Sequence, residues 1–153
     1  MIYSKVQNKY IPVKIYKQVV RLNANNVSTT YRIFDKKNYI GYVSVKDLSN
    51  GVFVNSIQNL QPKLYNKFGY LADQIEVEHC LNRGLQNFEI ISEAAFDSHA
   101  LHYLRGKRFK SKDDEAKVVK IINETPKGER YKSSQLGFLD MYMPQEIIQK
   151  YIE

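Results

Sequence analysis

The segment around Gly69 places a glycine beside two lysines, Lys63 and Lys67, at the start of a predicted helix over 70–83. The first turn of a helix presents main-chain N–H groups without intrahelical partners, together with partial positive charge. Phosphate groups bind at such ends. The spacing therefore predicts a phosphate site at this turn. The alternative is a plain strand-to-helix turn that carries surface lysines.

Other reactive side chains are few. His99 and His102 are three residues apart and share one face of a predicted short helix. No third ligand is evident near them, so we expect no metal site. The single cysteine, Cys80, lies inside the helix predicted over 70–83, where a small buried hydrophobic residue is the expected role. We expect its neighbour His79 at the surface or at its rim.

Composition narrows the class of protein. The chain has 153 residues with 43% hydrophobic side chains, which predicts one globular domain over 1–153 rather than a disordered chain. No stretch is long and apolar enough for a membrane span, and the lysine-rich N-terminus does not resemble a signal peptide. A lone cysteine fits a reducing compartment, so we expect a cytoplasmic location.

The net charge of +7 is unevenly distributed. Residues 1–34 carry six basic side chains and no acidic one, and the segment 105–132 carries ten basic and five acidic side chains. The latter segment resembles a basic insertion before the last strand. Such charge suits an anionic cofactor, an acidic partner, nucleic acid, or solubility alone. The tyrosines and lysines of the first third also suit a stacking platform for single-stranded nucleic acid, although packing within a sheet is the favoured explanation of the tyrosines.

Alternating β-forming residues predict three strands over 29–35, 39–46 and 52–60. The turn at 35–38 and the pair Asn50-Gly51 predict short connections, hence an antiparallel meander. A further strand over 10–22 is expected at a sheet edge, because Pro12 cannot donate a ladder hydrogen bond. Only residues 23–28 separate this strand from the strand predicted over 29–35.

Helical signals dominate the second half. A helix over 70–83 ending near Gly84 precedes a strand over 87–94 and a short helix after Asp97 and Ser98. A helix over 113–124, a strand over 136–143 and a final helix that begins at Pro144 follow. The order predicts an α+β fold in which a mostly antiparallel twisted central sheet has helices on its faces.

This order, and several short motifs within about 29–109, resemble the GNAT superfamily of acetyl-CoA-dependent N-acyltransferases. The run Tyr39-Ile40-Gly41-Tyr42 is similar to the family's third strand, and 52–60 followed by Gln61-Pro62 is similar to its fourth strand. The segment from Asn66 to Gly84 resembles the family's phosphate loop and helix, with Leu71 where a second glycine stands. The segment 88–109 resembles the fifth strand and the helix after it, with Asp97 at the position usually held by Asn.

The resemblance implies transfer of an acyl group, acetyl in the first instance, from acyl-CoA to an amine acceptor. It implies that acetyl-CoA is held by main-chain groups of the fourth strand and by the phosphate loop. The implied cofactor-binding residues are Ser56, Ile57, Asn59, Lys63, Asn66, Lys67, Gly69, Tyr70 and Asp97. The implied catalytic candidates are Glu93, His99 and Tyr103. An amine must lose its proton to attack, and a group that titrates near neutrality, such as His, suits that task.

Two alternatives remain open. The segment 52–60 contains no carboxylate, the family's two acceptor-side helices have no room within 23–28, and Leu71 replaces a glycine. These departures favour a GNAT-like binding module without catalysis. A basic nucleic-acid-binding domain is the less favoured alternative, because no nucleic-acid-binding motif is present. The sequence does not identify the acceptor or the oligomeric state.

Overall fold

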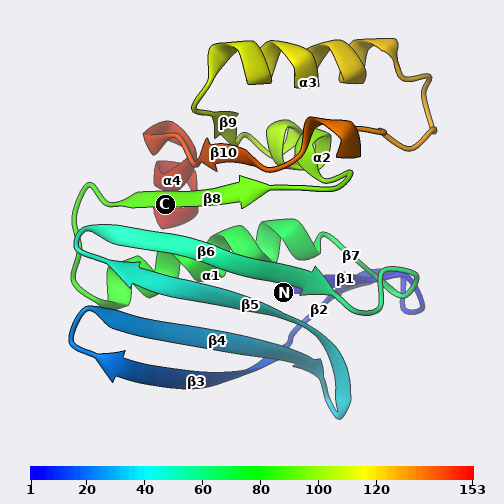
Figure 1. Cartoon of the computed structure of the whole chain (residues 1–153). Helices are drawn as coiled ribbons and strands as arrows, with labels where there is room; N and C mark the ends of the chain where they lie inside the picture. The colour runs from blue at the N-terminus through cyan, green and yellow to red at the C-terminus, as the bar shows by residue number, and fades with distance from the viewer. The chain divides into compact units, whose positions relative to one another are not determined.

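The computed structural model describes all residues 1–153, which form two compact units, Met1–Phe88 and Glu89–Glu153. The helices and strands of both units are labelled in Figure 1. The first unit contains β1 (Ile2–Ser4), β2 (Lys9–Ile11), β3 (Lys14–Asn23), β4 (Asn26–Asp35), β5 (Asn38–Leu48), β6 (Gly51–Asn59), β7 (Tyr65–Asn66) and α1 (Phe68–Asn82).

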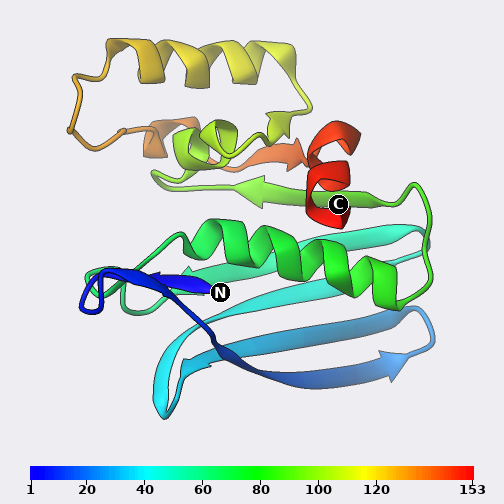
Figure 2. The ribbon, with the colours of Figure 1, turned by 180° about the vertical axis from the view of Figure 1, so that it is seen from behind.

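The predicted meander is confirmed. Strands β3, β4, β5 and β6 are successive antiparallel neighbours, and α1 lies against one face of this meander (Figures 1 and 2). Buried and less buried residues alternate along β4, as expected when only one face of a strand packs on a core. The connection between β3 and β4 is a tight turn, so no helix separates them.

One irregularity interrupts β6. Ser44 of β5 pairs with Ser56, whereas the next residue, Val45, pairs with Val54. Asn55 is therefore an extra residue opposite β5, which is a β-bulge. A bulge bends its strand and leaves main-chain groups outside the regular ladder. This bulge immediately precedes the part of β6 that the sequence nominated for cofactor binding.

The N-terminal strand differs from its prediction. A single strand was expected over 10–22, but the chain forms β2 and β3, with Pro12 between them. Proline has no N–H and fixes its φ angle, so it divides the segment instead of beginning one strand. The first of these two strands, β2, pairs with β1, and β1 also pairs with β7, giving a small three-stranded sheet.

Helix α1 begins against the meander because Gly41 leaves room for it. A Cβ atom at Gly41 would lie 2.1 Å from the carbonyl oxygen of Gln58 and 2.9 Å from the ring of Phe68. Phe68 is the first residue of α1 and is buried. The glycine in the Tyr39–Tyr42 run is thus required by close packing of a helix end on a strand.

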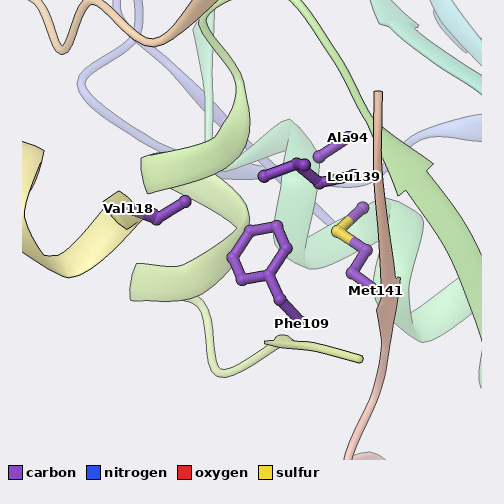
Figure 3. Packing of buried hydrophobic residues seen from close by; sticks show 5 residues of the cluster. All are labelled: Ala94, Phe109, Val118, Leu139 and Met141. Atoms are coloured by element: carbon purple, nitrogen blue, oxygen red, sulfur yellow. The ribbon is translucent and has the colours of Figure 1, made fainter. Parts of the chain in front are cut away.

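The second unit contains β8 (Glu89–Ala94), α2 (His99–Leu104), β9 (Arg108–Phe109), α3 (Lys112–Glu124), a 3-10 turn (Ser134–Leu136), β10 (Leu139–Tyr142) and α4 (Gln145–Ile152). Strand β10 is antiparallel to both β8 and β9 and lies between them. Its inward side chains help to form a cluster of five buried residues, shown in Figure 3. The cluster consists of Ala94, Phe109, Val118, Leu139 and Met141.

The predicted α+β class with antiparallel strands is confirmed, and each predicted helix is present within a few residues of its expected bounds. Pro144 is the residue before α4 and has extended backbone, so it caps the helix and is not its first residue. Strands β1, β7 and β9 were not predicted, because runs of two or three residues carry no periodicity. No helix in the chain is long and apolar enough to cross a membrane.

We expect Gly41→Ala to lower the free energy of unfolding by about 2 kcal/mol, because the added methyl group must displace a strand or the start of α1. Urea denaturation measures this change. Tyr42→Phe is the matched control: it removes one exposed hydrogen bond to Gln58 from the adjacent residue and should change stability by less than about 0.5 kcal/mol. Equal stability of Gly41→Ala and the parent would show that α1 does not depend on this contact.

Candidate functional site

The N-terminus of α1 has the features of an anion site. Lys67 precedes the helix in a left-handed conformation, no side chain caps the first turn, and that turn holds no acidic residue. The N–H groups of a first turn have no partner within the helix. Here they are accompanied by the lysine at the cap and by Gly69, whose lack of a side chain leaves the main chain accessible. The end of α1 is thus suited to a phosphate group.

The structure gathers most of the predicted phosphate-loop residues at this end. Lys63, Asn66 and Lys67 are exposed. Tyr70 is 45% exposed, and the Lys67 ammonium lies 5.6 Å from the centre of its ring. Leu71, which replaces a family glycine, is buried, so its side chain does not cover the front of the helix.

The end of β6 supports the loop before α1. The Asn59 side chain donates to the carbonyl of Tyr65 at 3.1 Å and accepts from the N–H of Gln61 at 2.9 Å. Both of these side-chain bonds hold the loop, which makes Asn59 a positioning residue. Ser56 is exposed and Ile57 is half-buried on the strand that follows the bulge.

The N-terminal strand braces the same loop, which the sequence did not indicate. Tyr3 and Ser4 of β1 pair with β7, and the N–H of Lys5 donates to the carbonyl of Leu64 at 2.8 Å. The Lys5 ammonium donates to the carbonyl of Pro62 at 3.1 Å, adding a cation to the loop. These partners are nearly sixty residues apart in sequence, so no local pattern could predict them.

Asp97, the predicted cofactor contact of the second unit, holds a loop. One carboxylate oxygen accepts from the N–H groups of Ser133 and Ser134, each at 2.9 Å, and the other lies 2.8 Å from the Arg130 guanidinium. These two N–H groups, together with Arg130, keep the pKa of Asp97 below its usual value. The carboxylate therefore caps the 3-10 turn that begins at Ser134.

His99 is buried, and both of its ring nitrogens have partners. Nε2 donates to the carbonyl of Gly137 at 2.8 Å, and Nδ1 shares a hydrogen bond of 2.6 Å with the hydroxyl of Ser133. A general base must reach the proton that it abstracts. The surroundings of His99 give it a positioning role in the segment that leads to β10.

The two other catalytic candidates are more accessible. Tyr103 is half-buried, packs against the cluster of Figure 3, and has the Arg108 guanidinium 4.6 Å from the centre of its ring. Glu93 is exposed on β8, directly across from Asp140 of β10. Of the three predicted catalytic residues, Glu93 alone has an exposed ionisable group.

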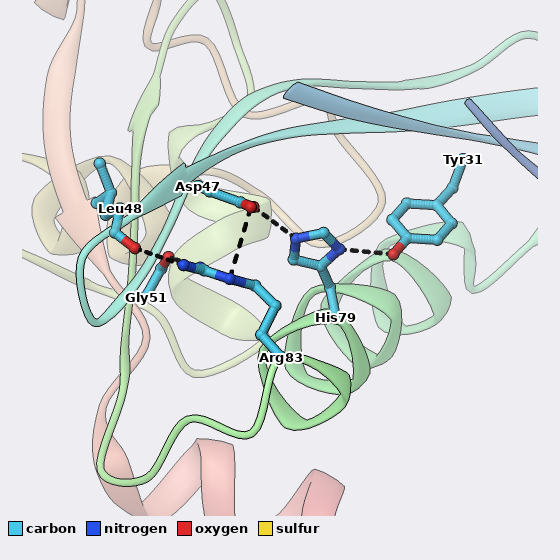
Figure 4. A network of polar contacts seen from close by, with 6 residues as sticks. All are labelled: Tyr31, Asp47, Leu48, Gly51, His79 and Arg83. Atoms are coloured by element: carbon cyan, nitrogen blue, oxygen red, sulfur yellow. Dashed lines mark hydrogen bonds and ion pairs between the residues drawn. The ribbon is translucent and has the colours of Figure 1, made fainter. Parts of the chain in front are cut away.

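His79 is buried, so the expectation that it lies at the surface is wrong. Its Nε2 is 2.7 Å from the Asp47 carboxylate and its Nδ1 is 2.6 Å from the Tyr31 hydroxyl (Figure 4). Arg83 lies 3.5 Å from the same carboxylate and donates to the carbonyls of Gly51 and Leu48. Burial, and then the charge of Asp47, raise the pKa of Tyr31 to about 12. The network joins α1 to β4 and β5.

Cys80 is fully buried, as expected for a small hydrophobic residue. Burial is the main cause that raises the pKa of its thiol to about 12. A thiol reacts as its thiolate, so this cysteine is inert at neutral pH. Nowhere in the chain do three His, Cys, Asp or Glu residues gather as a metal site would require.

A cavity of about 370 Å³ lies within the second unit, next to the start of α4. Its lining includes Glu89 and Lys110, together with Tyr142 at the end of β10 and Met143 just after it. None of the residues nominated from the sequence lines this cavity. It is therefore separate from the candidate residues described above.

Comparisons with known proteins concern the fold. No family model and no curated protein matches the sequence. Among solved structures, the chain is similar to an acyl-CoA N-acyltransferase from Pseudomonas aeruginosa, with a TM-score of 0.50 and 9% sequence identity over 76% of this chain and 68% of that chain. It is also similar to an IAA acetyltransferase from Bacillus cereus ATCC 14579, with a TM-score of 0.49 and 15% identity over 85% of this chain and 99% of that chain.

The first of these comparisons, together with the strand order, shows that the chain has a GNAT-like fold. The expected resemblance is confirmed at that level. At 9% sequence identity, the similarity concerns the arrangement of the backbone alone. The substrate of a protein is determined by particular side chains and not by its fold.

We expect His79→Ala to destabilise the protein by about 3 kcal/mol, because the Tyr31 hydroxyl and the Asp47 carboxylate would lose a buried partner. Urea denaturation at pH 7 measures the loss. Glu78→Ala, one residue earlier on the exposed side of α1, should cost less than about 1 kcal/mol. Similar losses in the two variants would show that the network does not anchor α1.

We also expect the free energy of unfolding to decrease as the pH is lowered, because His102 resists protonation in the folded protein. Burial, and then the charges of Lys107, Arg105 and His99, hold the pKa of His102 well below 6.5. Below about pH 6.5 the unfolded chain therefore binds a proton at His102 that the native state does not, so stability decreases as pH falls. His102→Gln should lose less stability than the parent between pH 7 and pH 5 in paired urea denaturations. Parallel losses would contradict this assignment.

Proposed function

We propose that the protein is an acyl-CoA-dependent N-acyltransferase that transfers an acetyl group to an amine. The N-terminus of α1 is the observation that supports this most: it is uncapped, lacks acidic residues and has Lys67 at its cap. A CoA diphosphate is an anion of the kind that helix ends bind. The GNAT-like fold supports the same proposal, because related folds carry this chemistry in proteins named acyltransferases.

The residues of the chain fit the diphosphate end of the cofactor. Gly69 and its neighbours present main-chain N–H groups, and Lys63, Lys67 and Lys5 supply positive charge around the same loop. Main-chain groups near the bulge of β6, from Ser56 to Asn59, would hold the pantetheine arm. When bound, the cofactor supplies an acyl thioester that an amine can attack.

The chain must also manage two protons. The acceptor amine must lose a proton before or during attack, and the departing thiolate gains one. Glu93 is the candidate for taking the amine proton, directly or through water, because its carboxylate is exposed. Tyr103 is the candidate for protonating the thiolate. His99 is proposed to hold the segment 133–137 in place, since both its nitrogens are bonded there.

The second candidate is a binding module of the same fold that lacks catalysis. The observation that favours it is that Asp97 and His99 both form hydrogen bonds to the same loop, residues 133–137. Calorimetry with CoA separates the two candidates when it is combined with an assay of free thiol released from acetyl-CoA across a panel of amines. Binding with turnover supports the enzyme, binding without turnover supports the module, and no binding at millimolar CoA contradicts the enzyme.

The phosphate site has its own test. Lys67→Glu should weaken CoA binding about tenfold, which corresponds to about 1.4 kcal/mol, because it places a negative charge beside the diphosphate. Binding of pantetheine, which lacks the diphosphate, should be unchanged. Lys127→Glu is the control for net charge, since Lys127 is an exposed loop residue of the second unit. A loss in Lys127→Glu equal to that in Lys67→Glu would contradict a local site.

A further inference from the structure

Strand β3 is an edge strand that is exposed along its full length. All ten residues, Lys14–Asn23, are exposed, and β4 is the only strand that pairs with it. Its apolar residues are no exception: Ile15, Val19, Val20 and Leu22 are 41%, 42%, 49% and 73% exposed. Long apolar edge strands are rare on stable monomers, because they attract other strands.

The open side of β3 offers a ladder of main-chain groups. In an antiparallel pair, every second residue directs its N–H and C=O toward the partner strand, and the residues between direct theirs outward. With β4 on one side only, the outward groups of β3 face solvent. An added strand would satisfy them and cover part of the exposed apolar side chains. Extended peptides bind to sheet edges in this manner.

The charge of β3 indicates what kind of strand it can accept. Lys14, Lys17 and Arg21 are its only charged residues, and no acidic residue occurs before Asp35. Asp35 is at the end of β4 and is bonded to the Tyr65 hydroxyl at 2.8 Å. The edge is therefore basic without local compensation. Cross-strand pairs of opposite charge are favourable, and pairs of like charge are not.

We propose that β3 is a docking edge for an extended acidic segment of a partner protein, which adds to the meander as a further antiparallel or parallel strand. Acidic side chains of that segment pair with Lys17 and Arg21, which share one face of β3, and its apolar side chains pack beside Tyr16 and Val20 on the other face. This gives a role to the basic residues of β3, which the proposed cofactor site at α1 does not use.

Two other occupants fit less well. A second copy of β3 would bring six basic side chains and no acidic one into a single two-stranded ribbon, twice the three of one strand. Nucleic acid would match the charge, but it has no alternating donor and acceptor ladder to pair with a strand edge. The main-chain groups favour a polypeptide, and the side chains favour an acidic one.

The test uses a fluorescent synthetic peptide of alternating Val and Glu with the full-length protein, followed by fluorescence anisotropy. Two matched peptides accompany it. One replaces each Glu by Lys, and the other replaces each Val by Pro, which keeps the charge but removes half of the N–H groups. We expect the Val–Glu peptide to bind and the two others to bind at least tenfold more weakly. Equal binding of the proline peptide would show charge attraction without strand addition and would overturn the proposal.

A protein variant completes the test. Lys14→Glu, Lys17→Glu and Arg21→Glu in combination should weaken binding of the Val–Glu peptide at least tenfold and favour the Val–Lys peptide. Circular dichroism checks that this variant is folded, and if it is not, the peptide series alone decides. Two results would overturn the proposal: a dimer that forms without peptide and blocks the edge, seen by light scattering, or tighter binding of a single-stranded oligonucleotide than of the peptide.

Discussion

The first unit depends on how α1 is fixed to the strands at both of its ends. At its N-terminus, Phe68 occupies space that exists only because residue 41 is glycine. Near its C-terminus, His79 joins Tyr31 to Asp47, and Arg83 binds the carbonyls that flank the β5–β6 turn. Packing controls one end of the helix and a polar network controls the other. Rotation or sliding of α1 would break both, so the direction of its first turn is defined.

A fixed first turn matters because main-chain N–H groups bind an anion only where they point. The loop before α1 is restrained by Asn59 from β6 and by β1 from the N-terminus. Lys67 takes a left-handed conformation, which is unfavourable for a residue with a side chain. The restraints on this loop come from two segments that are far apart in sequence, the end of β6 and the N-terminal strand β1.

Local patterns were sufficient to predict the meander and the helices. Alternating β-forming residues along 29–35 and 39–46 indicate strands with one buried face, and Asn50-Gly51 indicates a tight turn. These features depend only on residues that are close in sequence. The contacts of the candidate site are different. His79 meets Asp47, and Asp97 meets Ser133, across more than thirty residues. An imidazole in a helix looks the same in sequence whether it faces solvent or a carboxylate, which is why the sequence placed His79 at the surface.

The basic insertion-like segment gives a reason for the contacts of Asp97 and His99. It leaves the second unit's sheet after Phe109 and returns before β10, so it is a long excursion whose ends must be held. Glu115 binds the N–H of Phe109 at the departure, while Asp97 and His99 bind Ser133 and Gly137 at the return. Closing a loop costs entropy that such bonds must offset. A carboxylate and an imidazole committed to that closure are poorly placed to move protons. Of the three catalytic candidates, Glu93 takes no part in this closure and has an exposed side chain.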